Sequence, residues 1–132
     1  MRGAWFWLVG LLAAAEDHPG AEQIVAQVQA LAVEPVAVGA RGELSLVLLE
    51  PPDRSLPLDI RLDAGSLELD DNRLDWSFVV DPLALQPRVR TSFRAPSEPG
   101  SYQVRASVGY FICDEQWCRA KRGEVRWTVT VE

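Results

Sequence analysis

Two stretches near the end of the chain constrain its fold more than any other feature. Apolar side chains occupy every second position in 102–110 and again in 125–131, a pattern typical of strands with one buried face. If Cys113 and Cys118 stand opposite each other across the four-residue loop between them, both apolar faces fall on the same side of the sheet, whereas a slip by one residue would bury polar side chains. The alternation therefore predicts an antiparallel hairpin that brings the two cysteines together. The expected cross-strand partners are Tyr102 with Val129, Val104 with Trp127, and Ala106 with Val125.

The upstream sequence consists of short apolar runs separated by turn residues such as Pro51-Pro52-Asp53 and Ser97-Glu98-Pro99-Gly100. Residues 24–33 fit both a helical and a strand periodicity, and we favour a strand because everything downstream is β. Short strands with a turn every ten or so residues predict an all-β, immunoglobulin-like antiparallel β-sandwich. The expected strands lie within 24–33, 43–50, 58–62, 67–69, 74–80, 88–94, 102–110 and 125–131, with Trp76 and Trp127 pointing into the core.

The first residues are typical of an export signal. Arg2 supplies a positive charge, residues 4–12 form an apolar run, and 13–15 are small residues suited to cleavage. An uncleaved anchor is the alternative, but the run is shorter than the roughly 20 residues that span a bilayer. We therefore expect a signal peptide at 1–15, a flexible lead-in at 16–23 and one sandwich domain at 24–132, exported to a periplasmic or extracellular location without stable membrane insertion after cleavage.

Charge narrows the class of partner. The formal net charge of the chain is −6, and no basic cluster longer than residues 119–122 offsets it. An acidic surface repels the phosphate backbone, so we exclude nucleic acid as a partner.

The cysteine pair is the candidate catalytic or redox site. Strand parity places Cys113 and Cys118 on the outer face of the sheet, where a thiolate can reach them. A permanent staple is the alternative, although closing a loop of about six residues stabilises a protein by only roughly 2 kcal/mol. Arg119, Lys121 and Arg122 favour thiolate, whereas the carboxylates of the loop oppose it. Trp117, at the tip of the loop, is a candidate contact residue.

These residues resemble a known family. The run 99–104, then Tyr110-Phe111-Ile112-Cys113 to Cys118, then the alternating strand 125–131 look like the end of the amino-terminal periplasmic domain of the thiol:disulfide interchange protein DsbD and its relatives. The resemblance implies an immunoglobulin-like fold, a redox pair at Cys113 and Cys118 with aromatic Tyr110 and Phe111 beside it, and a membrane electron-transfer or thioredoxin-like partner. This sequence departs from the family in lacking a proline soon after Cys118 and a Gly-Trp-His-like stretch in 48–56, so an accessory thiol-exchange role is the expectation.

Other groups of residues give weaker indications of a metal site or a catalytic site. A mature terminus Glu16-Asp17-His18 would offer nitrogen ligands for Cu(II), but an ordinary solvated histidine is the alternative we favour. His18 is the only histidine, so a nucleophile–base pair for a hydrolase or transferase has no support. The sequence predicts neither a metal site nor a cofactor.

Overall fold

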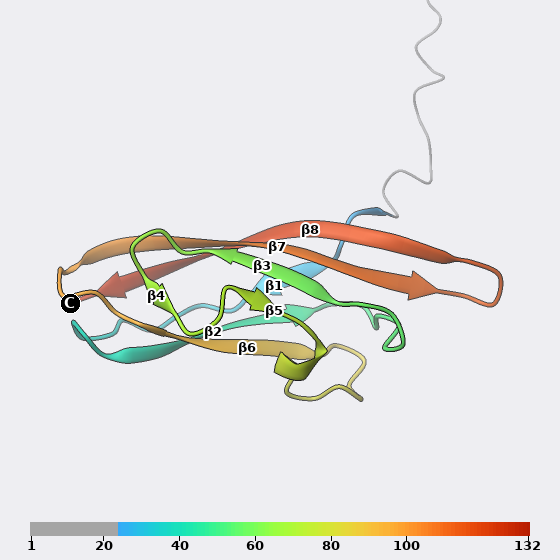
Figure 1. Cartoon of the computed structure of the whole chain (residues 1–132), viewed down its shortest axis with the longest axis horizontal. Coiled ribbons are helices and arrows are strands. Elements are labelled where there is room, and N and C mark those ends of the chain that lie inside the picture. Colours follow the sequence, from blue (N-terminus) through green and yellow to red (C-terminus); the bar gives the residue numbers. More distant parts are fainter. Residues whose placement is uncertain (1–23) are drawn as a thin grey trace, which may run out of the picture.

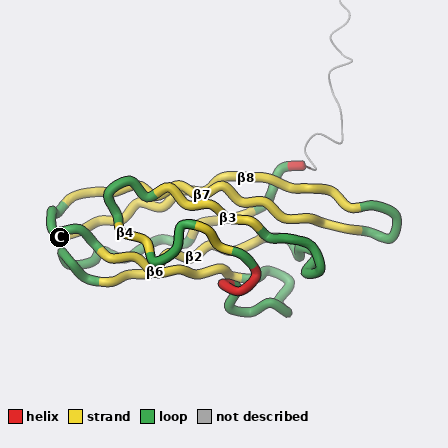
Figure 2. Tube along the Cα trace, viewed as in Figure 1, coloured by secondary structure: helices red, strands yellow, loops and turns green. Residues whose placement is uncertain are grey.

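Two antiparallel four-stranded β-sheets pack face to face in the computed structural model, which describes residues 24–132 (Figure 1 and Figure 2). One sheet has the order β1-β2-β6-β4 and the other β5-β3-β7-β8. The predicted all-β sandwich is therefore confirmed, and the predicted signal peptide at 1–15 and lead-in at 16–23 lie outside the described residues. The strands are β1 (Val28–Ala30), β2 (Arg41–Leu48), β3 (Asp59–Asp63), β4 (Glu68–Leu69), β5 (Arg73–Leu74), β6 (Arg88–Arg94), β7 (Gly100–Cys113) and β8 (Cys118–Val131).

The strand order is that of an immunoglobulin-like sandwich. β2 and β6 pair at the centre of one sheet, and β3, β7 and β8 follow one another in the second, as in the two sheets of the constant-type domain. Between β3 and β6 the chain visits both sheets, because β4 pairs with β6 and the following β5 pairs with β3.

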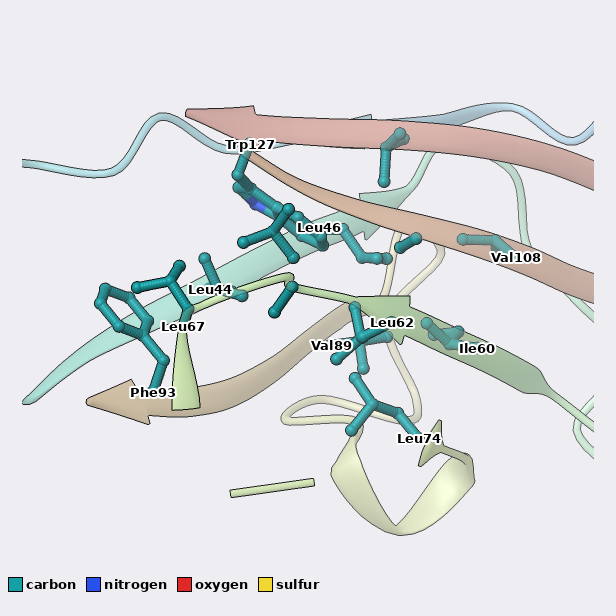
Figure 3. Packing of buried hydrophobic residues seen from close by; sticks show 14 of the residues in the cluster. Leu44, Leu46, Ile60, Leu62, Leu67, Leu74, Val89, Phe93, Val108 and Trp127 are labelled. Carbon is teal, nitrogen blue, oxygen red and sulfur yellow. The ribbon is translucent and has the colours of Figure 1, made fainter. Parts of the chain in front are cut away.

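The core lies between the sheets and is built from the inward side of each alternating strand (Figure 3). Burial of these side chains removes apolar surface from water and is the main force that holds the sheets together. The indole Nε1 of Trp127 on β8 also donates to the carbonyl of Ser45 on β2 at 2.9 Å, which joins the two sheets through a partly buried hydrogen bond. The core includes Leu44, Leu46, Leu48, Ile60, Val89, Phe93, Val104, Val108, Trp127 and Val129, each at most 3% exposed.

The segment around β1 belongs to both sheets. β1 pairs with β2, while Val25 and Val36 form parallel bridges to Arg122 and Val131 of β8. The Ala26 N–H donates to the Arg122 carbonyl at 2.8 Å. This segment therefore covers part of the β8 edge, which limits its pairing with other chains.

The strand predicted at 74–80 is wrong. β5 ends at Leu74, and Trp76–Phe78 form a 3-10 helix, η3. The Asp75 side chain accepts the Ser77 N–H at 2.9 Å, a local bond that competes with a strand ladder. The helix leaves Trp76 partly buried, with its indole donating to the Leu56 carbonyl at 2.8 Å.

Candidate functional site

The hairpin of β7 and β8 pairs continuously from Gly100 opposite Val131 to Cys113 opposite Cys118. The predicted register is confirmed at Tyr102 with Val129, Val104 with Trp127, and Ala106 with Val125. Pairing of β3 with β7 stops at Gly109, so beyond that point the two strands pair only with each other. Figure 1 shows the hairpin extending past the rest of the sandwich at the end opposite the C-terminus.

A disulfide bond joins Cys113 and Cys118 at the tip of this hairpin, with their Cα atoms 4.0 Å apart. Cys118 is exposed and Cys113 is partly buried. Both share the parity of outward-facing positions such as Arg105 and Arg126, which are exposed. The predicted placement on the outer face is therefore confirmed, and solvent reaches the pair.

Asp114 shapes the loop inside the disulfide. Its carboxylate accepts the N–H groups of Gln116 at 2.8 Å and Trp117 at 3.0 Å, while its own N–H donates to the Trp117 carbonyl at 2.9 Å. The two backbone hydrogen bonds, first that from Gln116, hold the pKa of Asp114 below its ordinary value. A stable negative charge therefore stands next to Cys113 and disfavours a thiolate there.

Trp117 and Phe111 flank the cysteines in different ways. Trp117 is 43% exposed, and the guanidinium of Arg119 lies 4.0 Å from its ring centroid, a cation–π contact. Phe111 is partly buried on the same face of β7 as Cys113, and its carbonyl accepts the Asp53 N–H at 2.7 Å. This bond fastens the β2–β3 loop to the hairpin next to the disulfide.

Tyr110 lies on the other side of the hairpin from the cysteines and is 1% exposed. Its hydroxyl donates to the Glu50 carboxylate and accepts the Gln27 N–H at 2.9 Å. Burial, followed by the hydrogen bond to Glu50, raises the pKa of Tyr110. Tyr110 thus anchors the base of the hairpin, and contact between its ring and a partner stays a prediction.

Sequence reasoning missed the partners of Tyr110. Lys121, directly opposite Tyr110, is 6% exposed and places its Nζ 3.3 Å from both the Glu50 carboxylate and the Val25 carbonyl. Lys121 has an odd residue number, like the buried Val125 and Trp127, so strand alternation places it on the inward face of β8. This alternation is the signal that could have revealed its burial. Lys121 therefore neutralises Glu50 inside the fold and does not face the cysteines.

Together, the fold and the site define an immunoglobulin-like sandwich that carries an exposed disulfide on a projecting hairpin. Neither a family model nor a curated protein matches this chain. Among residues 24–132, no helix is long and apolar enough to cross a membrane, and no three His, Cys, Asp or Glu side chains are grouped to hold a metal ion.

Proposed function

We propose that this chain is an exported thiol-disulfide exchange or redox accessory domain that uses Cys113 and Cys118. The observation that carries the proposal is the position of the disulfide, at the exposed tip of a hairpin that projects beyond the sandwich. A bond there joins two strands already paired over their whole length and ties no distant parts of the fold together. Exchange chemistry instead requires that a thiolate can reach one of the two sulfurs, and Cys118 is exposed.

In the exchange step, a partner thiolate attacks Cys118 Sγ, because Cys118 is the more exposed of the pair. The Cys113–Cys118 bond breaks as the intermolecular disulfide forms, and Cys113 leaves as a thiolate that takes up a proton. The second thiolate of the partner then attacks the partner sulfur that is bonded to Cys118 Sγ. Cys118 leaves as a thiolate. Two electrons pass from the partner dithiol to the pair, and the partner is left with a disulfide.

The resemblance to the amino-terminal periplasmic domain of DsbD supports the same role. The immunoglobulin-like order and the cysteine pair on the β7–β8 hairpin agree with what that family implies. On this basis we infer a periplasmic location and a thioredoxin-like or membrane electron-transfer partner. A disulfide also suits an oxidising compartment.

The second candidate is a binding or structural module in which the disulfide is a permanent staple. The observation in its favour is the ordered loop, because Asp114 fixes the turn within the disulfide through two backbone hydrogen bonds. A turn held this way keeps the sulfurs together and favours the oxidised state.

The reduction potential separates the two functions. We expect equilibration with thiol buffers, read by alkylation and mass spectrometry, to give a potential less negative than about −300 mV, the level below which structural disulfides lie. A value well below that level would establish the staple instead.

The single variants Cys113→Ser and Cys118→Ser test the proposed order of attack. With a peptide whose cysteine is joined in a disulfide to a chromogenic thiol, Cys118 in the Cys113→Ser protein should form the mixed disulfide and release the chromogenic thiolate faster than Cys113 in the reciprocal variant. The comparison belongs at a pH above the ordinary thiol pKa, so that both cysteines are thiolates. Equal rates would contradict preferential attack at Cys118. They would not bear on the reduction potential of the Cys113–Cys118 pair.

A further inference from the structure

The outer face of the β5-β3-β7-β8 sheet carries a concentration of arginines on the same side as the disulfide. We call this surface the arginine face. β3 and β5 supply two of its arginines, and β7 and β8 supply three. Its members, all exposed, are Arg61, Arg73, Arg105, Arg122 and Arg126.

Carboxylates on this face do not balance the arginines. Arg61 and Arg73 share the single carboxylate of Asp59, with each Nε 3.3 Å from one of its oxygens. Arg105 pairs with Asp63 at 3.3 Å. The third carboxylate on the face, Glu124, makes no ion pair within 4.0 Å among the described residues.

Two arginines of the face have no such counterion. Within residues 24–132, no carboxylate lies within 4.0 Å of Arg122 or Arg126. Arg126 also stands directly opposite Arg105 across β7 and β8, an arrangement of like charges that disfavours the sheet. The fold itself gains nothing from this excess of positive charge.

The other sheet provides an internal comparison. On its outer face, three of the four arginines each have a carboxylate of their own within 4.0 Å, and among the described residues only Arg88 of this set has none. The chain as a whole carries a formal charge of −6. In the described part of the chain, the face that the cysteines share therefore carries two arginines without a counterion, Arg122 and Arg126, against one on the other face. The paired groups of the other face are Arg41 with Asp70, Arg90 with Glu43, and Arg94 with Glu68.

Small residues form the surface between Arg122 and the disulfide. Arg122 is four residues along β8 from Cys118, about 13 Å at the rise of a strand. Opposite it stands Gly109, and the Arg122 guanidinium lies across this glycine, with Nη1 3.1 Å from the point where a Cβ would be. Ala120, an exposed small residue, separates Arg122 from Cys118 on the same face. A partner lying flat on this surface can therefore contact the guanidinium and the disulfide together.

We propose that the arginine face docks an acidic protein surface that borders the reactive dithiol of the partner. The proposal rests on the exchange function and names the chemistry of its partner. Arg122 and Arg126 supply the uncompensated charge, and complementary charge of this kind raises the rate of encounter and orients the two molecules.

Two dithiol peptides of identical core, one flanked by glutamates and the other by lysines, test the proposal on the full chain. We expect the glutamate peptide to reduce the disulfide about tenfold faster at low ionic strength, within the range of electrostatic steering. The difference should nearly vanish at about 1 M salt, where the Debye length is about 3 Å. Arg122→Glu/Arg126→Glu should abolish or invert the preference. Stopped-flow fluorescence or quenched alkylation measures the rates.

Arg88→Glu/Arg90→Glu is the matched control, because it changes the net charge equally on the outer face of the other sheet and should leave the preference largely intact. Dithiothreitol, which carries no charge beyond the attacking thiolate that both peptides also use, should react at nearly the same rate with every variant. If both peptides reduce the pair at equal rates in low salt, the arginine face is not the docking surface and the exchange function stands. If neither peptide nor dithiothreitol reduces the pair at any salt concentration, the exchange function fails and this inference with it. If Arg122→Glu/Arg126→Glu loses binding to anionic phospholipid vesicles while leaving the peptide rates unchanged, the occupant is a bilayer and the proposal is wrong.

Discussion

Lys121 is the one lysine of the chain, and it is buried beneath the hairpin that carries the disulfide. Its ammonium contacts Glu50 from the β2–β3 loop and the Val25 carbonyl from the N-terminal segment. Tyr110 adds a hydrogen bond to Glu50 and accepts another from Gln27. Three segments distant in sequence thus meet at one charged cluster, which fixes the direction in which the hairpin leaves the sandwich.

Replacing Lys121 by methionine should destabilise the protein by about 1 to 3 kcal/mol, because the change leaves the partly buried Glu50 carboxylate without its cation. Urea unfolding measures the free energy. The double variant Glu50→Gln/Lys121→Met, which removes both charges, should cost clearly less. Equal losses in the two variants would show that packing of the lysine stem, and not the ion pair, matters at this position.

The raised pKa of Tyr110 predicts a loss of stability in alkali. The folded state holds the phenol neutral, so this contribution is complete below the unfolded pKa of about 10 and falls as pH rises above it. Tyr110→Phe lacks the titrating group and should have a flatter alkaline profile, although it is less stable near neutrality. Thermal unfolding from neutral to strongly alkaline pH compares the two. Parallel profiles would contradict a raised pKa.

At the scale of the element, the β7–β8 hairpin determines its own register. Alternating apolar residues face the core along both strands, and the pairing continues without interruption to the cysteines. A shift by one residue would turn Val104 and Trp127 toward solvent. The sulfurs therefore meet because the strands are already aligned.

It follows that Cys113→Ala/Cys118→Ala should fold to the same sandwich and lose only about 2 kcal/mol, the chain-entropy value for so short a loop. Denaturant unfolding gives the loss, and circular dichroism reports the retained sheet. A protein that fails to fold without the bond would indicate that the disulfide organises the hairpin, as a staple would.

For the whole molecule, the contact between the two sheets is the decisive feature. Trp127 fills the core from β8 and donates its indole N–H to Ser45 on β2, in the opposite sheet. Trp76 makes a similar indole bond to Leu56, but it lies in η3 and packs against the core from a partly buried position.

Trp127→Phe should therefore cost about 1 to 2 kcal/mol, from the lost hydrogen bond and the smaller ring. Trp76→Phe is the matched control and should cost less, because solvent can satisfy the Leu56 carbonyl. Both losses are measurable by urea unfolding. A larger cost at Trp76 would mean that η3 carries more of the stability than its burial indicates.

Local sequence patterns predicted most of the strands, and they failed where side chains bond locally. The run 88–94 matches β6 because its apolar residues alternate with outward arginines. The run 74–80 also alternates, but Asp75 bonds to the Ser77 backbone and turns the chain into η3. Residues 24–33 give only the short β1, because the same segment also bonds to β8.

The sequence by itself determined the all-β class, the hairpin register and the meeting of Cys113 with Cys118, because the two-residue period of a strand fixes which side chains share a face. Only the tertiary structure decided that Lys121 pairs with Glu50, that the Tyr110 hydroxyl bonds to Glu50 and Gln27, and that the arginines of β3, β5, β7 and β8 form one surface. These arrangements join segments far apart along the chain, and their geometry comes from the packing of the sheets and from loops whose paths no local pattern encodes.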